Sequence, residues 1–341
     1  MPTLTIVSAS DSRYLPGLFV TWGSILKFSP SISIDFHLLH DGVNDQEVDQ
    51  LRSRLSKVRG NFTVTAHQLE DKLFADFPEF FYDSKMPYAR LLIPKIIDSD
   101  RVLYVDTDFV LTRDVSEFLE VDFQDKAIAV AEEWDYNGTD DSMRFADQFP
   151  NVADHRYFNS GLLYLNLDRI RAQGSFDQAM KLLVKYTDRC LYYDQTALNV
   201  VFAGRCVYLD PNVNYQIKSG HEPDVASLSQ LSERGVNLHY VAKTKPWLCT
   251  HHSLAHRFYH TVRASLEGDQ ATAKRCRQSM PVLASCLING AKGVRLKTTA
   301  AIGIGDASGA RRIGREHFKH AHLLWRELCD NNKIAAMLRS I

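Results

Sequence analysis

Two carboxylates stand at the end of an apolar run, in the stretch VLYVDTDFV that spans residues 102–110. Asp106 and Asp108 are close enough in the chain to repel each other unless a positive group lies between them. One chemistry that uses this pattern is a divalent cation that binds two oxygen ligands and also holds a diphosphate. A phosphorylated nucleophile beside an acid is a second, and a strand end with two turn-forming aspartates is a third.

Four other polar residues could share a site with this pair. Arg90, in YARL, could hydrogen-bond a sugar hydroxyl or a carboxylate, or could be an ordinary surface arginine. Asn159, in YFNSGLL, could bind a hydroxyl or form a turn before a buried strand. His239 could supply an imidazole ligand to a metal, although a lone histidine is more often a core residue. Lys245 could neutralise a leaving phosphate.

The elements that must position these residues begin with an apolar strand at 4–10. Helical spacing follows in YLPGLFVTWGSILKFSP, and ISIDFHLLHDGV is a second strand. NDQEVDQLRSRLSKVRG has an asparagine cap and a glycine stop, which predict a helix, and FTVTAHQL is a third strand. This alternation predicts an α/β fold with a mixed, mainly parallel sheet flanked by helices.

The rest of the body continues the alternation. We expect a helix at 88–98, strands at 101–112, 126–133 and 160–171, helices at 176–189 and 194–204, and strands at 206–214 and 236–241. Ligands of such open sheets bind beyond the carboxyl ends of the strands. Ser10, Asp11, the acidic pair and His239 all fall at strand ends, so we expect them to meet at one edge of the sheet.

Composition limits the class of protein. The chain has 341 residues, 45% of them hydrophobic, which is enough for a large core. No run approaches the roughly 18 apolar residues of a membrane span, and MPTLTIVSASDSRYL lacks the basic and apolar regions of a signal peptide. The six cysteines form no C-x-x-C pair, which predicts reduced thiols and a cytoplasmic location.

The net charge of −1 conceals an asymmetry. Residues 242–341 carry 17 Lys and Arg against 6 Asp and Glu, a balance of +11 that leaves −12 on residues 1–241. Together with helical spacing, this predicts a basic, mostly helical extension at 264–341. The extension either forms a solvated face on the acidic body or holds the protein peripherally at an anionic surface, such as the inner face of the plasma membrane. We expect no nucleic-acid partner.

Five segments together resemble glycosyltransferase family 8, which includes bacterial lipopolysaccharide galactosyl- and glucosyltransferases and glycogenin-like enzymes. From about residue 4 to residue 260, the chain has YARL, YVDTDFV, YFNSGLLYLNL, YYDQTALN and LHYVAKTKPW in the family's order and spacing. The resemblance implies a GT-A catalytic domain at 1–263 and a UDP-glucose or UDP-galactose donor. It also implies Mn²⁺, with Mg²⁺ as the alternative, and retaining transfer to a saccharide acceptor in lipopolysaccharide or another cell-surface glycan.

The resemblance assigns roles residue by residue. It implies metal ligation by Asp106, Asp108 and His239, and catalytic roles for Asp194, Gln195 and Lys245. The residues implied to bind the donor are Ala9, Asp11, Tyr14, Arg90, Asp106, Thr107, Asp108, Asn159 and Lys245. The chain departs from the family pattern at Ser12, Arg13, Thr196 and Ala242, where relatives often carry Asp, Asn, Asp and Gly. These departures concern the nucleotide contacts and the exact sugar more than the reaction type.

Retention at the anomeric carbon has two routes. A double displacement would need Gln195 or Asp194 as the nucleophile, and an amide is a poor one. We therefore expect a front-face path, in which acceptor and leaving group use the same face of the sugar. In that path Asp194 is better suited to holding donor hydroxyls.

Two other functions stay open. Phosphatases of the haloacid-dehalogenase type use D-x-D-x-[TV], which Asp106, Asp108 and Val110 match. They place it near the first strand and add a later acidic pair with a lysine, whereas here it follows about a hundred residues of α/β pattern. The other alternative is a catalytically silent scaffold of the same fold that binds glycan or membrane. The intact acidic, glutamine and lysine positions argue against that scaffold.

Overall fold

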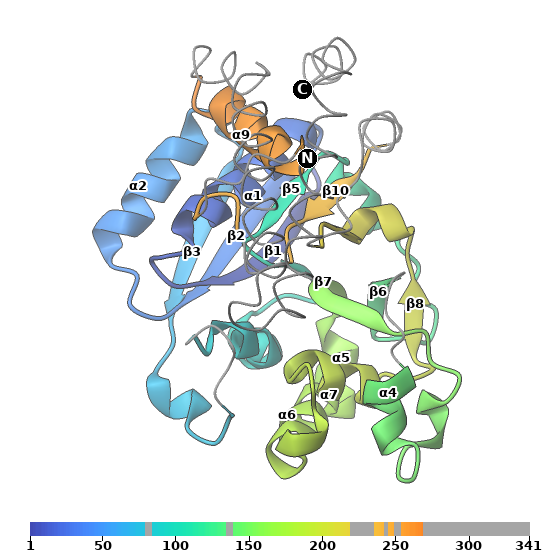
Figure 1. Ribbon diagram of the computed structural model, residues 1–341. Coiled ribbons are helices and arrows are strands. Elements are labelled where there is room, and N and C mark those ends of the chain that lie inside the picture. The colour runs from blue at the N-terminus through green and yellow to red at the C-terminus, as the bar shows by residue number, and fades with distance from the viewer. Residues whose placement is uncertain (79–83, 134–138, 219–234, 242–244, 249–253, 269–341) are drawn as a thin grey trace, which may run out of the picture. The chain divides into compact units, whose positions relative to one another are not determined.

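The computed structural model describes residues 1–78, 84–133, 139–218, 235–241, 245–248 and 254–268 (Figure 1). The chain divides into two compact units. The first unit is Met1–Tyr215 with Val236–His239, and the second is Gln216–Gly235 with Tyr240–Ile341. Among the described residues, the central sheet and every helix except the last belong to the first unit.

The central sheet has seven strands in the order β3-β2-β1-β4-β7-β6-β8 (Figure 1). Its strands are β1 (Thr3–Ser10), β2 (Ser33–His40), β3 (Phe62–Gln68), β4 (Arg101–Val105), β6 (Ile128–Glu132), β7 (Phe158–Asn166) and β8 (Cys206–Tyr208). The pairs β1–β2, β2–β3, β1–β4 and β6–β8 are parallel, while β7 runs antiparallel to β4 and β6. The predicted mixed, mainly parallel sheet is confirmed.

Helices cover both faces of this sheet, which is why its central strands are almost continuous apolar runs. On one face, α1 (Leu15–Phe28) packs Trp22 against Phe36, and the indole Nε1 donates to Ser8 Oγ at 3.0 Å. On the other face, Val7, Tyr104 and neighbouring residues join a core cluster with side chains from α6 and α7. Figure 1 shows α5 (Leu167–Gln173), α6 (Ser175–Lys185) and α7 (Asp194–Val201) grouped near β7.

Local signals set the ends of several helices. Asn44 begins α2 (Asp45–Ser56) with a capping box: its side chain accepts from Glu47 N, and the Glu47 carboxylate accepts from Asn44 N, both at 3.0 Å. Gly174 ends α5 in the left-handed conformation. The remaining short elements are η1 (Asp71–Phe74), η2 (Met86–Leu92), α3 (Ile93–Ile96), η3 (Val115–Glu120), α4 (Thr139–Ser142), η4 (Met143–Phe145), η5 (Pro150–Val152), η6 (Thr187–Arg189) and η7 (Pro211–Asn214).

The predicted single strand at 101–112 is wrong, because the structure divides it. After β4, residues 106–108 turn the chain, and β5 (Phe109–Leu111) joins a second sheet of order β5-β10-β9, with β10 (Asn237–His239) and β9 (Tyr215–Gln216). Thr21 Oγ1 and Ser24 Oγ on α1 accept the N–H groups of Phe109 and Leu111 at 3.1 and 3.0 Å. These bonds and the pairing with β10 hold β5 away from the central sheet.

Two other predicted elements also differ. The predicted helix at 88–98 is a 3₁₀ turn followed by the four-residue α3, in which Pro94 removes a backbone donor. The predicted strand at 160–171 ends at Asn166, whose side chain accepts from Arg169 N at 3.1 Å and so begins α5. An asparagine at this position favours a helix start over further extension.

In the second unit, α9 (Leu254–Leu266) packs on the short stretch that follows β10. Tyr240 donates to Ala255 O at 2.7 Å, and its ring meets Tyr259 edge-on with centroids 5.6 Å apart. The predicted domain boundary at 263/264 falls within this helix, and residues 269–341 of the predicted basic extension lie outside the described residues. No helix in the described part is long and apolar enough to span a bilayer.

Candidate functional site

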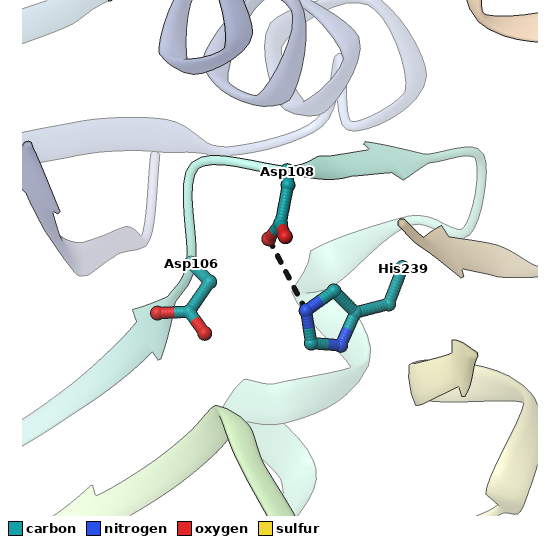
Figure 2. Close-up of side chains that lie close together, drawn as sticks. All are labelled: Asp106, Asp108 and His239. Atoms are coloured by element: carbon teal, nitrogen blue, oxygen red, sulfur yellow. Dashed lines mark ion pairs between the residues drawn. The ribbon is translucent and has the colours of Figure 1, made fainter. Parts of the chain in front are cut away.

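The acidic pair and the predicted histidine meet at the junction of the two sheets of the first unit (Figure 2). Asp106 follows β4, Asp108 precedes β5, and His239 ends β10 opposite Phe109 in the antiparallel register. Each of the three offers a ligand atom, and these atoms all lie within 4.8 Å of one another. His239 Nε2 lies 3.1 Å from Asp108 Oδ1, and the imidazole stacks on the Phe109 ring at 4.0 Å.

This donor set fits a divalent cation. The side chains of Asp106, Asp108 and His239 are 24%, 10% and 3% exposed, so the cluster is largely shielded from solvent. Oxygen and imidazole ligands suit Mn²⁺, and a cation offsets the carboxylate repulsion. Space beside the cluster is tight: a Cβ at Gly161 would lie 2.3 Å from His239 Cε1 and 2.9 Å from Asp106 Oδ2.

Arg90 connects the cluster of Asp106, Asp108 and His239 to a third carboxylate, that of Asp194. Its Nη2 donates to Asp106 Oδ1 at 3.1 Å, and its Nε lies 3.1 Å from Asp194 Oδ2. Its Nη1 donates to the carbonyl oxygen of Ser160 and, at 2.9 Å, to Ser160 Oγ. Burial alone would lower the pKa of Arg90, but Asp106, Tyr104 and Asp194 together raise it above its ordinary value. Of the partners predicted for Arg90, the structure shows the carboxylates.

Asp194 is a buried acid at the start of α7. Burial raises the pKa of Asp194 to about 6, with Arg90 opposing the shift and Asp106 adding to it. The preceding residue, Tyr193, has φ +53° and ψ −120°, a conformation that side chains disfavour and that costs about 1–3 kcal/mol. This strained turn sets the direction in which the side chains of Asp194 and Gln195 project from the backbone.

The side-chain amide of Gln195 is oriented by its neighbours. Its Oε1 accepts from the backbone N–H of Ser160 and from Asn159 Nδ2, both at 3.0 Å. Its Nε2 faces Tyr157 Oη and Glu133 Oε2 at 3.4 and 3.5 Å. A backbone N–H can only donate, so the oxygen must be the atom beside Ser160. Both lone pairs of Oε1 are therefore engaged.

Sequence reasoning did not identify Asn214, which the structure places next to His239. Asn214 Oδ1 lies 2.9 Å from His239 Nδ1, and Asn214 Nδ2 donates to Asn159 Oδ1 at 3.1 Å. Asn214 is buried in η7, within the stretch 206–214 that we expected to be a strand. The one signal in the sequence is an uncharged polar residue at the end of PNVN, which resembles an ordinary turn.

Three of the predicted donor-binding residues, Ala9, Asp11 and Tyr14, lie at or just after the carboxyl end of β1. Ala9 is nearly buried, and Tyr14 precedes α1 as its N-cap. The carboxylate of Asp11 accepts from Arg13 N and from Arg13 Nη2, both at 2.9 Å. Arg13, one of the departures from the family pattern, is thus a hydrogen-bond partner of Asp11, the acid that the resemblance assigns to donor binding. Thr107 is buried in the turn between the two metal-site carboxylates.

The structure brings together seven of the predicted residues: Arg90, Asp106, Asp108, Asn159, Asp194, Gln195 and His239. Lys245 belongs to the second unit, where its Nζ donates to Tyr240 O at 2.7 Å. Its proposed contact with a donor phosphate therefore stays a prediction.

Comparison with known proteins identifies the family. The profile of the family described as Glycosyl transferase family 8 matches residues 5–251. The chain belongs to this family. The lipopolysaccharide 1,2-glucosyltransferase of Escherichia coli K12 is 26% identical over 250 residues, 72% of each chain. The lipopolysaccharide 1,3-galactosyltransferase of Salmonella typhimurium LT2 is 25% identical over 246 residues, 70% of this chain and 71% of that one.

Solved structures agree on the fold. The galactosyltransferase LgtC, in complex with donor and acceptor sugar analogs, superposes with a TM-score of 0.64 at 24% identity. The match covers 77% of this chain and 96% of LgtC. It confirms the predicted GT-A fold, and the family assignment makes the protein a glycosyltransferase rather than a phosphatase.

Proposed function

We propose that this glycosyltransferase moves a hexose from UDP-glucose or UDP-galactose to a saccharide acceptor, with retention and with a divalent cation. The observation that carries the proposal is the cluster of two carboxylates and one imidazole within 4.8 Å, in a chain of glycosyltransferase family 8. Mn²⁺ suits this mixed donor set best, and Mg²⁺ is the alternative. An intact cluster of this kind also argues against a catalytically silent scaffold.

The two carboxylate oxygens of Asp106 have different neighbours. Tyr104 Oη donates to Asp106 Oδ1 at 2.6 Å, and Arg90 Nη2 donates to the same oxygen. Among the contacts of the described residues, Oδ2 has only the longer one of 3.4 Å to Arg90, and it lies on the side of Gly161, toward His239. Asp106 Oδ2, Asp108 and His239 Nε2 would hold the ion. When bound, the ion stabilises the negative charge of the departing diphosphate.

The contacts of Gln195 and Asp194 favour a front-face path. Two donors engage Gln195 Oε1, and the buried Asp194 carboxylate is paired with Arg90, so neither is prepared to attack an anomeric carbon. In the front-face path, the acceptor hydroxyl attacks from the side that UDP leaves, and its proton passes to the leaving diphosphate. Gln195 and Asp194 then orient the donor sugar. Lys245 is assigned to the leaving phosphate.

The relatives named above support the proposed substrates. One is a lipopolysaccharide 1,2-glucosyltransferase and the other a lipopolysaccharide 1,3-galactosyltransferase, so we assign a hexose donor and an acceptor in lipopolysaccharide or another cell-surface glycan. Ala9, Asp11, Tyr14 and Thr107 are assigned to the nucleotide, and Asn159 to the donor sugar. We place the protein in the cytoplasm or on the inner face of the plasma membrane. A chain truncated after α9 should lose binding to anionic vesicles if the basic extension supplies that contact.

A panel of UDP-sugars tests the reaction. Release of UDP is measured for each sugar with Mn²⁺, with Mg²⁺, and after chelation and dialysis. UDP-glucose or UDP-galactose should be hydrolysed in the presence of the ion, and turnover should stop on chelation. Full activity in the metal-free protein would refute the cation, and inactivity toward every UDP-sugar would refute the donor.

A further inference from the structure

A chain of side-chain amides joins the imidazole of His239 to the amide of Gln195. Asn214 contacts His239 Nδ1 at 2.9 Å and Asn159 at 3.1 Å, and Asn159 contacts Gln195 at 3.0 Å. Three side-chain amides are thus connected in series, and the oxygen and nitrogen ends of each must alternate for every contact to be a hydrogen bond. The direction of the series decides which nitrogen of His239 carries the proton.

The backbone of Gly161 fixes that direction. Its N–H donates at 2.9 Å to the side chain of Asn159, and because it can only donate, the atom it faces must be Asn159 Oδ1. Asn214 lies against the same oxygen and must therefore present its NH₂ group there. This leaves Asn214 Oδ1, an acceptor, facing His239 Nδ1. Consequently His239 Nδ1 carries a hydrogen.

The other end of the series gives the same direction independently. The N–H of Ser160 donates to Gln195 Oε1, so the neighbour of that oxygen on Asn159 must be the donor Nδ2. Asn159 Oδ1 is then again the end that faces Asn214. Two backbone amides, that of Gly161 at Asn159 Oδ1 and that of Ser160 at Gln195 Oε1, thus impose one orientation on the whole series.

We infer that Asn214 is a positioning residue that holds His239 in the tautomer able to bind the cation. With the hydrogen on Nδ1, the neutral ring has its lone pair on Nε2, the nitrogen that faces Asp108 Oδ1 at 3.1 Å. An acceptor that faces the ring nitrogen away from the metal sets the tautomer of a metal-binding histidine, and its loss changes metal affinity about 10–100-fold. The inference rests on the proposed cation site, but the protonation of Nδ1 is a property of the protein alone.

Removing the acceptor should reverse the tautomer. In Asn214→Leu, the acceptor that Asn214 offers to Nδ1 is gone, whereas the carboxylate oxygen Asp108 Oδ1 still lies 3.1 Å from Nε2. The neutral ring should then protonate at Nε2 and lose its ligand lone pair. Asn214→Asp keeps an acceptor for Nδ1–H but cannot donate to Asn159 Oδ1. Comparison of the two variants therefore distinguishes an effect of the His239 tautomer from an effect of changed packing or of the lost hydrogen bond to Asn159.

The first measurement uses metal-free protein. Long-range ¹H–¹⁵N spectra of protein with ¹⁵N-labelled histidine are recorded about two pH units above the ordinary imidazole pKa, and His239→Gln identifies the signal. His239 Nδ1 should be protonated in the wild type and in Asn214→Asp, and should become the bare, pyridine-type nitrogen in Asn214→Leu. A bare Nδ1 in the wild type would overturn the inference.

The second measurement is Mn²⁺ affinity by calorimetry or electron paramagnetic resonance. Asn214→Leu should bind about 10–100-fold more weakly than the wild type, and Asn214→Asp within about threefold of it. Asn166→Leu removes a side chain that accepts a backbone N–H of α5 and serves as the matched control, which should lose thermal stability but not Mn²⁺ affinity. Wild-type affinity in Asn214→Leu, or equal losses in both Asn214 variants, would overturn the inference.

The outcomes also separate this inference from the proposed function. A wild-type protein that binds neither Mn²⁺ nor Mg²⁺ refutes the cation site, and the tautomer spectra of the metal-free protein still decide the role of Asn214.

Discussion

Gly161 offers the sharpest test of the candidate cation site formed by Asp106, Asp108 and His239, because it approaches these side chains with its backbone alone. Its carbonyl oxygen accepts from Asp106 N at 2.8 Å, and its N–H donates to Asn159. A methyl group at this position would lie 2.3 Å from His239 Cε1 and 2.9 Å from both Asn159 Oδ1 and Asp106 Oδ2. The φ of Gly161 is not in the left-handed region, so Gly161→Ala changes the packing rather than the backbone preference.

The size of the effect of Gly161→Ala depends on how firmly the side chains around the new methyl group are held. Normal carbon contacts are about 3.5–4.0 Å, so the ring and the new methyl group must separate by about 1.2 Å or more. The ring cannot move freely, since Asn214 holds Nδ1 and Phe109 stacks on its face. Overpacking of this kind costs about 1–3 kcal/mol of unfolding free energy. A displacement of about 1 Å at a catalytic centre costs about 100-fold in rate.

The assay compares Gly161→Ala with Gly60→Ala. Gly60 has nothing within 4 Å of the added methyl group and does not have a left-handed φ, so its substitution should leave stability unchanged or slightly raised. Mn²⁺ affinity should fall at least about tenfold in Gly161→Ala, with UDP release about 100-fold slower. Wild-type Mn²⁺ affinity and turnover in a folded Gly161→Ala protein would refute the geometry of the cluster.

Three further predictions concern the charges in and around the site. Asp108→Asn should abolish cation-dependent UDP release while the circular dichroism spectrum stays that of the wild type; retained activity would exclude Asp108 as a ligand. Arg90→Ala should lower the unfolding free energy in urea by about 3–5 kcal/mol, because it leaves Asp106 and Asp194 without their buried partner; a loss below about 1 kcal/mol would contradict the pairing. Burial lowers the pKa of His155 below 6.5, so its contribution to stability should be complete above that value and be lost as the pH falls below it. His155→Gln should show a flatter dependence of unfolding free energy on pH over this window, and an unchanged slope would contradict the assignment.

The order of elements could be predicted because each depends on local patterns. The capping box at Asn44 and the apolar runs around Leu103 and Leu163 identify their helix and strands without any knowledge of the partners. The division of residues 101–112 could not be predicted. The apolar run continues through the turn, and only the bonds of β5 to α1 and β10 show that the second half belongs to another sheet.

The candidate site was partly predictable for the same reason. Asp106, Asp108 and His239 were found from residue type, position at strand ends and family resemblance, and the structure brings them together. The role of Asn214 depends on two tertiary contacts, one to a residue 55 positions earlier and one to a residue 25 positions later. No local pattern in PNVN encodes those contacts, so its place beside the imidazole was visible only in the structure.

The three residues of the cluster lie at the ends of strands from two different sheets. A bound cation would therefore affect how firmly these two sheets are held together. Asp106 follows β4 of the central sheet, whereas Asp108 directly precedes β5 and His239 ends β10, both strands of the small sheet. A bound cation would therefore cross-link the two sheets through β10, a strand of only three residues. Local opening of β10 should become rarer as the ion concentration rises above its dissociation constant. The ion would thus be a reversible cross-link between the two sheets. Amide hydrogen exchange at residues 237–239 would report the fraction of protein with the ion bound.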